Sequence, residues 1–248
     1  MTRDFQAGNY RFIPAVFQYS SGSAALPGYE IERVRFDKWL PLADGFGRIA
    51  KYIQGAGRPL TSFCACELRS PAAFTDDGFR KFNEHYVKTL AEWGIYDGTT
   101  NPVARSNVCP EIDPPWEPSF YAFSFTRPSQ STTPTFVIAG GAEAREGRGF
   151  YAERTVRYRD LSPEGLREKV RFTTREQMEN RLEQFGFGWK DTTAAQAYSV
   201  RNFYPVMSEE LVRRGAVRSG LTWHFARPPV IDLEFEMDCR RVMHETVI

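Results

Sequence analysis

Two arginine–serine pairs are the residues best suited to bind an anionic substrate. Arg105-Ser106 and Arg218-Ser219 each stand at the start of a predicted strand, one pair in each half of the chain. A guanidinium presents a planar fork that grips a carboxylate through two parallel hydrogen bonds. An isolated arginine on an edge strand is usually a plain surface residue, but the repeated context favours binding. We therefore expect Arg105 and Arg218 to hold a small carboxylic acid.

Two glutamates near the end of the chain could supply acid–base chemistry. Glu234 and Glu236 alternate with apolar residues, so both are predicted to project from the same face of a strand, opposite the apolar set. A carboxyl group beside a cleft does general acid–base work at neutral pH when its pKa is raised. A solvated strand face is the alternative, and which glutamate faces a cleft stays open. The matching strand of the first half, residues 120–125, has no carboxylate, which predicts one catalytic class of cleft and one degenerate class.

Signatures of metal, phosphate and serine-hydrolase chemistry are missing from the sequence. The three histidines form no cluster, and Cys64 and Cys66 have the two-residue spacing of one strand face, which favours buried thiols over a zinc pair. Neither a P-loop nor a Gly-x-Ser-x-Gly nucleophile elbow occurs. We expect no metal and no cofactor.

The composition of the chain argues against some classes of binding partner. Lys and Arg number 32 against 31 Asp and Glu, a net charge of +1, which argues against nucleic acid. No window approaches the roughly 18 apolar residues that a membrane helix needs, and the first residues lack a signal-peptide core. A cytoplasmic protein that acts on small molecules is expected.

The first half of the chain predicts the order β, α, β, α, β, β. Its helices follow from apolar residues at three-to-four-residue spacing and from glycines that end them. The predicted elements are a strand over 10–21, a helix over 38–54, a strand over 59–68, a helix over 76–93, and strands over 103–112 and 120–125.

The second half repeats this order after a polar stretch, residues 126–134, that is typical of a linker. Because each repeat pairs two helices with one face of a sheet, we expect an α+β protein of two tandem modules, residues 1–130 and 131–248. The predicted elements are strands over 135–142 and 150–158, a helix from 173 to 185, a strand over 192–200, a helix over 208–214, and strands over 221–225 and 230–237.

Several segments resemble the RidA (YjgF) family, in order and twice along the chain. The first half carries a helix that ends in glycine, a Phe…Asn…Tyr helix and a Pro-Val-Ala-Arg-Ser strand, in residues 45–57, 79–86 and 102–106. The second half carries a similar helix end, arginine strand and glutamate-bearing strand, in residues 185–191, 216–219 and 231–237.

This resemblance implies chorismate-mutase-like modules, each a mixed sheet with two helices on one face, that assemble in threes around an axis. With two modules per chain, two layers of three then imply a homo-oligomer, a trimer of chains, with clefts between modules. A self-contained or pseudo-symmetric arrangement is the alternative. By the same resemblance, Arg105 and Arg218 bind the substrate carboxylate and Glu234 directs water. The implied substrate-binding residues, of which the glycines could equally be turn residues and Asn83 a surface residue, are Ser21, Gly22, Asn83, Gly140, Gly141 and Ser219.

The resemblance also implies a reaction. The first hypothesis is a cofactor-independent enamine/imine deaminase that releases ammonia from a 2-amino-enoic acid, similar to the 2-aminomuconate-type deaminases of aromatic catabolism. The second is a chorismatase-like hydrolase that releases pyruvate. The third is a regulatory module that binds a small acid without turnover.

Overall fold

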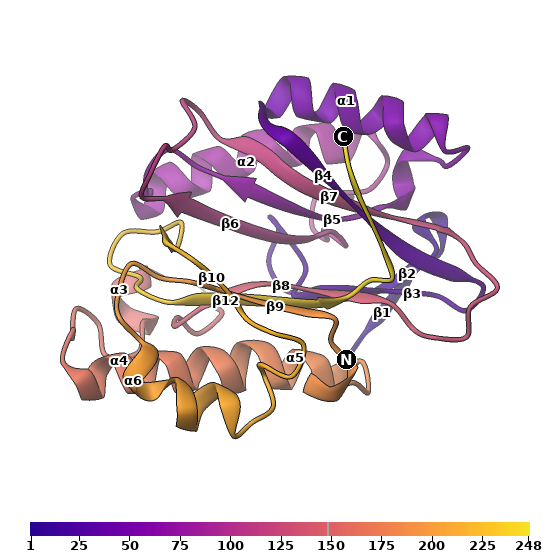
Figure 1. Cartoon of the computed structure of the whole chain (residues 1–248). Coiled ribbons are helices and arrows are strands. Elements are labelled where there is room, and N and C mark those ends of the chain that lie inside the picture. Colours follow the sequence, from indigo (N-terminus) through magenta and orange to yellow (C-terminus); the bar gives the residue numbers. More distant parts are fainter. Residues whose placement is uncertain (148) are drawn as a thin grey trace.

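Two mixed β-sheets lie face to face and helices cover both outer faces, as Figure 1 shows. The structure is a computed structural model that describes residues 1–147 and 149–248. This arrangement confirms the predicted α+β class and the predicted pairing of helices with one face of each sheet. No helix among the described residues has the length and apolar character to cross a membrane.

One sheet has six strands in the order β11-β6-β5-β7-β4-β13. Its outer face packs against two helices, α1 (Leu42–Gly55) and α2 (Asp76–Glu92), through an aromatic core that includes Phe46, Tyr86 and Phe123. Thr75 begins α2 by accepting a hydrogen bond from the Gly78 N–H. The strands are β4 (Tyr29–Pro41), β5 (Phe63–Arg69), β6 (Ala104–Pro110), β7 (Ser119–Pro128), β11 (Ala226–Arg227) and β13 (His244–Val247).

The other sheet has seven strands in the order β1-β2-β3-β8-β12-β9-β10. All its pairs are antiparallel except β9 with β10. The strands are β1 (Arg3–Phe5), β2 (Tyr10–Ile13), β3 (Gly22–Ala25), β8 (Phe136–Ala142), β9 (Ala194–Tyr198), β10 (Thr222–His224) and β12 (Glu236–Arg241).

A long composite helix covers the outer face of the seven-stranded sheet. Ser162 caps its first turn, and it then runs through α4 (Pro163–Phe172), a π-helical segment η3 (Thr173–Glu179) and α5 (Asn180–Gln184). A second helix, α6 (Tyr204–Met207) continued by η5 (Ser208–Val212), packs beside it over the same apolar core. The short helices are η1 (Gln6–Gly8), η2 (Leu60–Ser62), α3 (Tyr151–Arg154) and η4 (Trp189–Asp191).

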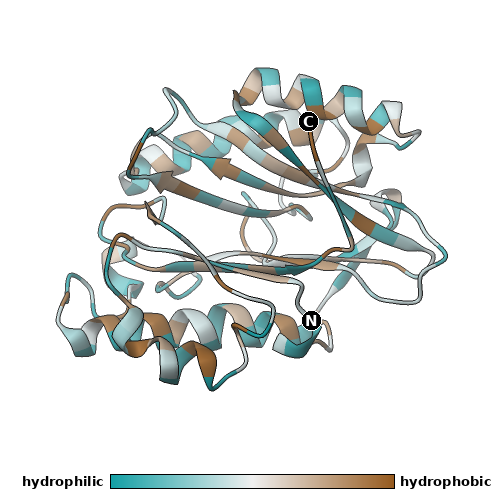
Figure 2. Ribbon diagram, in the orientation of Figure 1, coloured by the Kyte–Doolittle hydropathy of each residue, from teal (hydrophilic) through white to brown (hydrophobic). Residues whose placement is uncertain are grey.

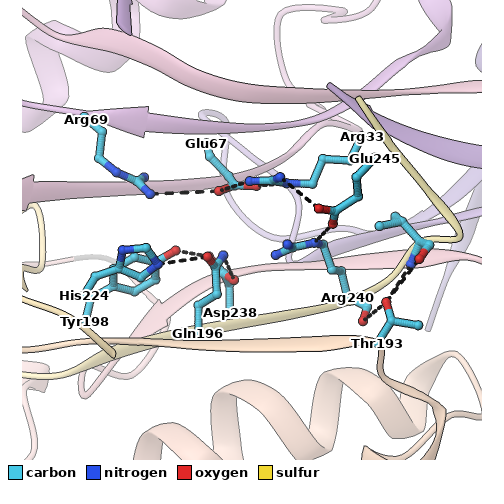
Figure 3. Close-up of polar contacts among 11 residues, drawn as sticks. Arg33, Glu67, Arg69, Thr193, Gln196, Tyr198, His224, Asp238, Arg240 and Glu245 are labelled. Atoms are coloured by element: carbon cyan, nitrogen blue, oxygen red, sulfur yellow. Dashed lines mark hydrogen bonds and ion pairs between the residues drawn. The ribbon is translucent and has the colours of Figure 1, made fainter. Parts of the chain in front are cut away.

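Polar side chains fill the space between the two sheets (Figure 3). Arg33 on β4 donates two hydrogen bonds, of 2.6 and 3.0 Å, to Glu67 on β5. On the opposite sheet Asp238 accepts hydrogen bonds from Gln196, Tyr198 and, across the gap, from Ser106. The inner faces therefore carry polar side chains beside smaller apolar clusters that join the two sheets, while the helix-covered outer faces are apolar. The mixed hydropathy along the strands in Figure 2 agrees with this pattern.

Two predicted strands are wrong. Residues 150–158 form α3 and a turn, because Arg157 adopts a φ of 50°, in the left-handed region that strands do not use. Residues 230–235 are irregular and only Glu236 and Met237 belong to β12, which runs on to Arg241. Here Asp232 has a φ of 69°, and the Glu143 carboxylate accepts the backbone N–H groups of residues 234 and 235.

Other boundaries differ from the prediction. The strand expected over 10–21 ends at Ile13 before a proline, and β4 was not predicted, because charged residues lie on both of its faces. The helix expected from residue 173 begins at Pro163.

Each sheet also contains strands from both sides of the predicted module boundary. The N-terminal hairpin β1–β3 joins β8 of the second half, while β11 and β13 join strands of the first half. The division into residues 1–130 and 131–248 therefore stays a prediction, in which the two modules would exchange edge strands.

Candidate active site

A cavity opens between the two sheets, where β6 faces β8 and β12. This inner cavity measures about 50 Å³ and is lined by residues of those strands, of the composite helix and of the segment before α4. It shares five lining residues with an outer cavity of about 940 Å³, so the inner space is the closed end of a larger cleft. The shared residues are Tyr19, Phe79, Glu146, Tyr151 and Arg154.

Arg105 brings a positive charge to this inner cavity. The residue lies on β6 with 3 % of its surface exposed, and its Nη1 has no hydrogen-bond partner among the described residues. Aromatic rings surround the guanidinium, with Tyr86 at 4.8 Å and Tyr19 at 5.3 Å from the guanidinium carbon to the ring centre. A buried cation without an anionic partner is costly, so this group fits an anion that enters the cleft.

Glu236 supplies the carboxyl group of the cavity. It is 4 % exposed at the start of β12, and no described residue donates a hydrogen bond to its side chain. Burial, and then the nearby Asp238 carboxylate, raise the pKa of Glu236 well above its ordinary value, although Arg181 opposes the shift. A carboxyl group with a raised pKa is suited to donate a proton to a substrate.

Gly140 on β8 makes room for this carboxyl group, and Gly141 beside it makes room for the composite helix. A Cβ atom on Gly140 would lie 2.1 Å from Glu236 Oε1 and 3.0 Å from Ser106 Cα. A Cβ atom on Gly141 would lie 2.6 Å from the Gln177 side chain. Both positions are therefore restricted to glycine by close packing, and not by a turn.

An ion pair forms one wall of the cavity. Arg181 on α5 donates a hydrogen bond of 2.8 Å to Glu146, and its Nη1 donates to the Ala139 carbonyl at 3.0 Å. Ser21 donates to the same Glu146 carboxylate at 2.9 Å. The predicted residue Ser21 thus reaches the cleft only through Glu146, and the charge of Arg181 is already matched.

Asn83 lines the outer cavity. Its Nδ2 donates to the Phe79 carbonyl one helical turn earlier, and its buried Oδ1 has no partner among the described residues.

Besides Ser21 and Asn83, four more predicted site residues do not line the inner cavity. Glu234 is paired with Arg201, from Nε to Oε2 at 2.7 Å, and Gly22 packs beneath the Phe185 ring. Arg218 and Ser219 were expected at the start of a strand, but they lie exposed in the turn that follows η5, where Ser219 donates to the Thr192 carbonyl. The strand placement of Arg218 was wrong because Gly215 and Gly220, both with positive φ, turn the backbone on either side of it.

Sequence reasoning missed most of the residues around the cavity. Gln177 and Arg181 are spaced i, i+4 on the buried face of the composite helix, among Val170, Met178 and Leu182, and polar residues on an apolar face are a detectable signal. Arg154 and Tyr151 carried no such signal, because their segment resembled a strand.

The described residues contain no cluster of metal-ligating side chains. The cleft therefore combines a buried unpaired guanidinium, a carboxyl group with a raised pKa and aromatic walls. Such groups suit the binding and protonation of a small, unsaturated carboxylic acid.

Fold and cleft together define an α+β enzyme of small carboxylic acids. The chain belongs to the family described as 2-aminomuconate deaminase CnbZ, whose model matches residues 2–246. It is 53 % identical over 246 residues to the 2-amino-5-chloromuconate deaminase of Comamonas testosteroni, with 98 % of each chain covered. Its predicted resemblance to deaminases of the 2-aminomuconate type is thereby confirmed.

One solved structure supports the fold. The crystal structure of a chorismatase matches with a TM-score of 0.52 at 13 % sequence identity. The match covers 89 % of this chain and 77 % of the chorismatase chain. At that identity the likeness concerns the fold alone. A protein from Thermotoga maritima matches with a TM-score of 0.30 and 15 % identity, over 54 % of this chain and 91 % of its own.

Proposed function

We propose that this 2-aminomuconate-type deaminase hydrolyses its substrate in the inner cavity, with Arg105 as the carboxylate-binding residue and Glu236 as the general acid and base. The observation that carries this assignment is the buried Arg105 guanidinium, which has an unpaired Nη1 and shares a cavity with a carboxyl group of raised pKa. The substrate class is a planar 2-amino-dienedioic acid, and the 5-chloro acid of the relative's name is one candidate member.

The proposed reaction consists of proton transfers, the addition of water and the loss of ammonia. The neutral Glu236 donates its proton to a chain carbon of the enamine, which becomes the protonated imine. The resulting carboxylate accepts a proton from water as the oxygen attacks the C=N carbon, and a neutral carbinolamine forms. Return of that proton to nitrogen lets ammonia leave as the C–N bond breaks, and the carboxylate then accepts the proton of the remaining hydroxyl group, so that water is consumed, a 2-oxo acid forms and Glu236 is neutral again. Arg105 holds the adjacent carboxylate throughout, which orients the reacting carbon.

Ammonia release from freshly generated 2-aminomuconate tests this assignment. We expect Glu236→Gln to lower kcat by about 100-fold or more, the usual range for loss of a general acid–base group. Arg105→Met should raise KM strongly, because it removes a charge-assisted bond to the substrate. Glu234→Gln and Arg218→Met test the two residues that the sequence alone favoured for the acid–base and carboxylate-binding roles.

Three results would contradict the proposal. Full activity in Glu236→Gln together with its loss in Glu234→Gln would return the acid–base role to Glu234. An unchanged KM in folded Arg105→Met would remove the arginine from the site. Pyruvate as the product of an enolpyruvyl ether, without ammonia from the enamine, would favour the chorismatase-like alternative.

The proposal includes a cytoplasmic enzyme that assembles as a trimer of chains, as the family resemblance implies. The four cysteines are all free and buried, which agrees with a reducing compartment. Light scattering of the purified protein tests the assembly, and a monomer would contradict it.

A further inference from the structure

The charges around the inner cavity do not cancel. Arg181 is matched by Glu146 at 2.8 Å, but Arg105 and Arg154 each keep a buried guanidinium nitrogen without a partner among the described residues. Glu236 is the other carboxyl group that lines the cavity, and it is buried beside the Asp238 carboxylate, which raises its pKa and favours its neutral form. The cleft therefore presents two unmatched positive charges.

Arg154 is held in place by its own segment. Its guanidinium carbon lies 4.0 Å from the centre of the Tyr151 ring, a cation–π contact, and its Nη1 donates to the Arg145 carbonyl at 2.7 Å. The Arg145 N–H in turn donates to the Arg154 carbonyl at 3.0 Å. These contacts fix the side chain yet leave its Nε, which is buried, without an acceptor among the described residues.

The two arginines occupy different depths of the cleft. Of these two cavities Arg105 lines the inner one alone, whereas Arg154 lines both and so marks their junction. The inner cavity, at about 50 Å³, has room for only about four water-sized groups. A six-carbon diacid therefore has to extend from the inner cavity to the junction. Apolar side chains that line this path, Phe79, Pro229 and Leu233, suit its unsaturated carbons.

We propose that Arg154 binds the second carboxylate of the substrate, the one distant from the amino-bearing carbon, and thereby selects dicarboxylates over monocarboxylates. This inference rests on the proposed function for the role of Arg105 at the first carboxylate. Arg154 would be a specificity-determining residue, since it reaches the substrate but not the reacting carbon.

Equilibrium binding of two unreactive probes tests the inference. Hexa-2,4-dienedioate and hexa-2,4-dienoate have the same carbon chain and differ by one carboxylate, and neither carries an amino group. We expect Arg154→Met to weaken binding of the dienedioate by about tenfold or more, the usual effect of losing a charged hydrogen bond, and to change binding of the dienoate by less than about twofold. Arg105→Met should weaken both.

A matched control is available three residues further on. Arg157 lines neither cavity and pairs with Asp160 at 2.7 Å on the surface, so Arg157→Met should leave both affinities unchanged. Thermal unfolding checks that each variant is folded. If Arg154→Met fails to fold, Arg154→Lys serves in its place, because it keeps the charge but loses the planar fork, and it should still weaken the dienedioate selectively.

An equal loss for both probes, or no loss for either, would overturn the role of Arg154. Failure of the wild-type protein to prefer the dienedioate would overturn it too. These readouts do not depend on turnover, so a wild-type protein that binds the dienedioate selectively but releases no ammonia would refute the deaminase assignment and leave the role of Arg154 intact.

Discussion

The burial of Glu236 suits its proposed role as an acid but lowers the stability of the folded protein as the pH rises. Its carboxyl group is buried beside Asp238 without a hydrogen bond from any described residue, and burial raises its pKa. At pH 4, below the ordinary pKa of about 4.3 in an unfolded chain, the Glu236 carboxyl group is mostly protonated in both states. As the pH rises, the Glu236 carboxyl group ionises in the unfolded chain, which stabilises the unfolded state, while the same group stays protonated in the folded protein. The free energy of unfolding therefore falls until the pH reaches the folded-state pKa of Glu236.

Glu236→Gln removes this titration. We expect the stability of the variant relative to the wild-type protein to increase from pH 4 to pH 8, as measured by urea unfolding midpoints. A constant difference across that range would mean that the Glu236 pKa is not raised in the folded protein.

The sequence could predict part of the site at this scale. Arg105 and the glycine pair stand in two recognisable strands, β6 and β8, and the sequence predicted all three as site residues. Which glutamate faces the cavity could not be predicted, because alternation along an assumed strand placed Glu234 and Glu236 on one face. In the structure Glu234 precedes β12 and turns to Arg201.

At the scale of elements, a fully buried ion pair explains why that strand begins late. Lys169 on α4 and Glu143 after β8 are both 0 % exposed, and Nζ lies 3.3 Å from Oε1. Glu143 also accepts the backbone N–H groups of Glu234 and Phe235, at 2.6 and 3.0 Å. The pair therefore holds the segment that delivers Glu236 to the cavity. No sequence pattern predicts it, since its partners are joined only by the fold.

Lys169→Met tests this role, because it leaves the Glu143 carboxylate buried without its counter-ion. We expect a loss of about 3–5 kcal/mol in the free energy of unfolding. The double variant Glu143→Gln, Lys169→Met removes both charges and should recover part of that loss, as measured in a double-mutant cycle by urea unfolding. Additive losses would show that the two side chains do not interact.

On the scale of the whole molecule, the sequence predicted two sheets, each with two helices on one face, because apolar periodicity indicates which faces pack together. It could not predict the exchange of strands. The pairings of β3 with β8 and of β13 with β4 join residues more than 100 positions apart, and edge strands carry little hydrophobic pattern.

This exchange predicts how the halves behave when they are separated. A fragment of residues 131–248 would lose β3, so that β8 becomes an exposed edge with unpaired backbone groups, and a fragment of residues 1–130 would lose β11 and β13. Arg33 would also lose Glu245, and Ser106 would lose Asp238. We expect neither fragment alone to unfold cooperatively in urea, and expect the two to recover a cooperative transition when they are refolded together. Cooperative unfolding of either fragment by itself would show instead that the predicted modules are independent domains. The exchanged strands would then contribute to the cleft between the sheets but would not be needed for each half to fold.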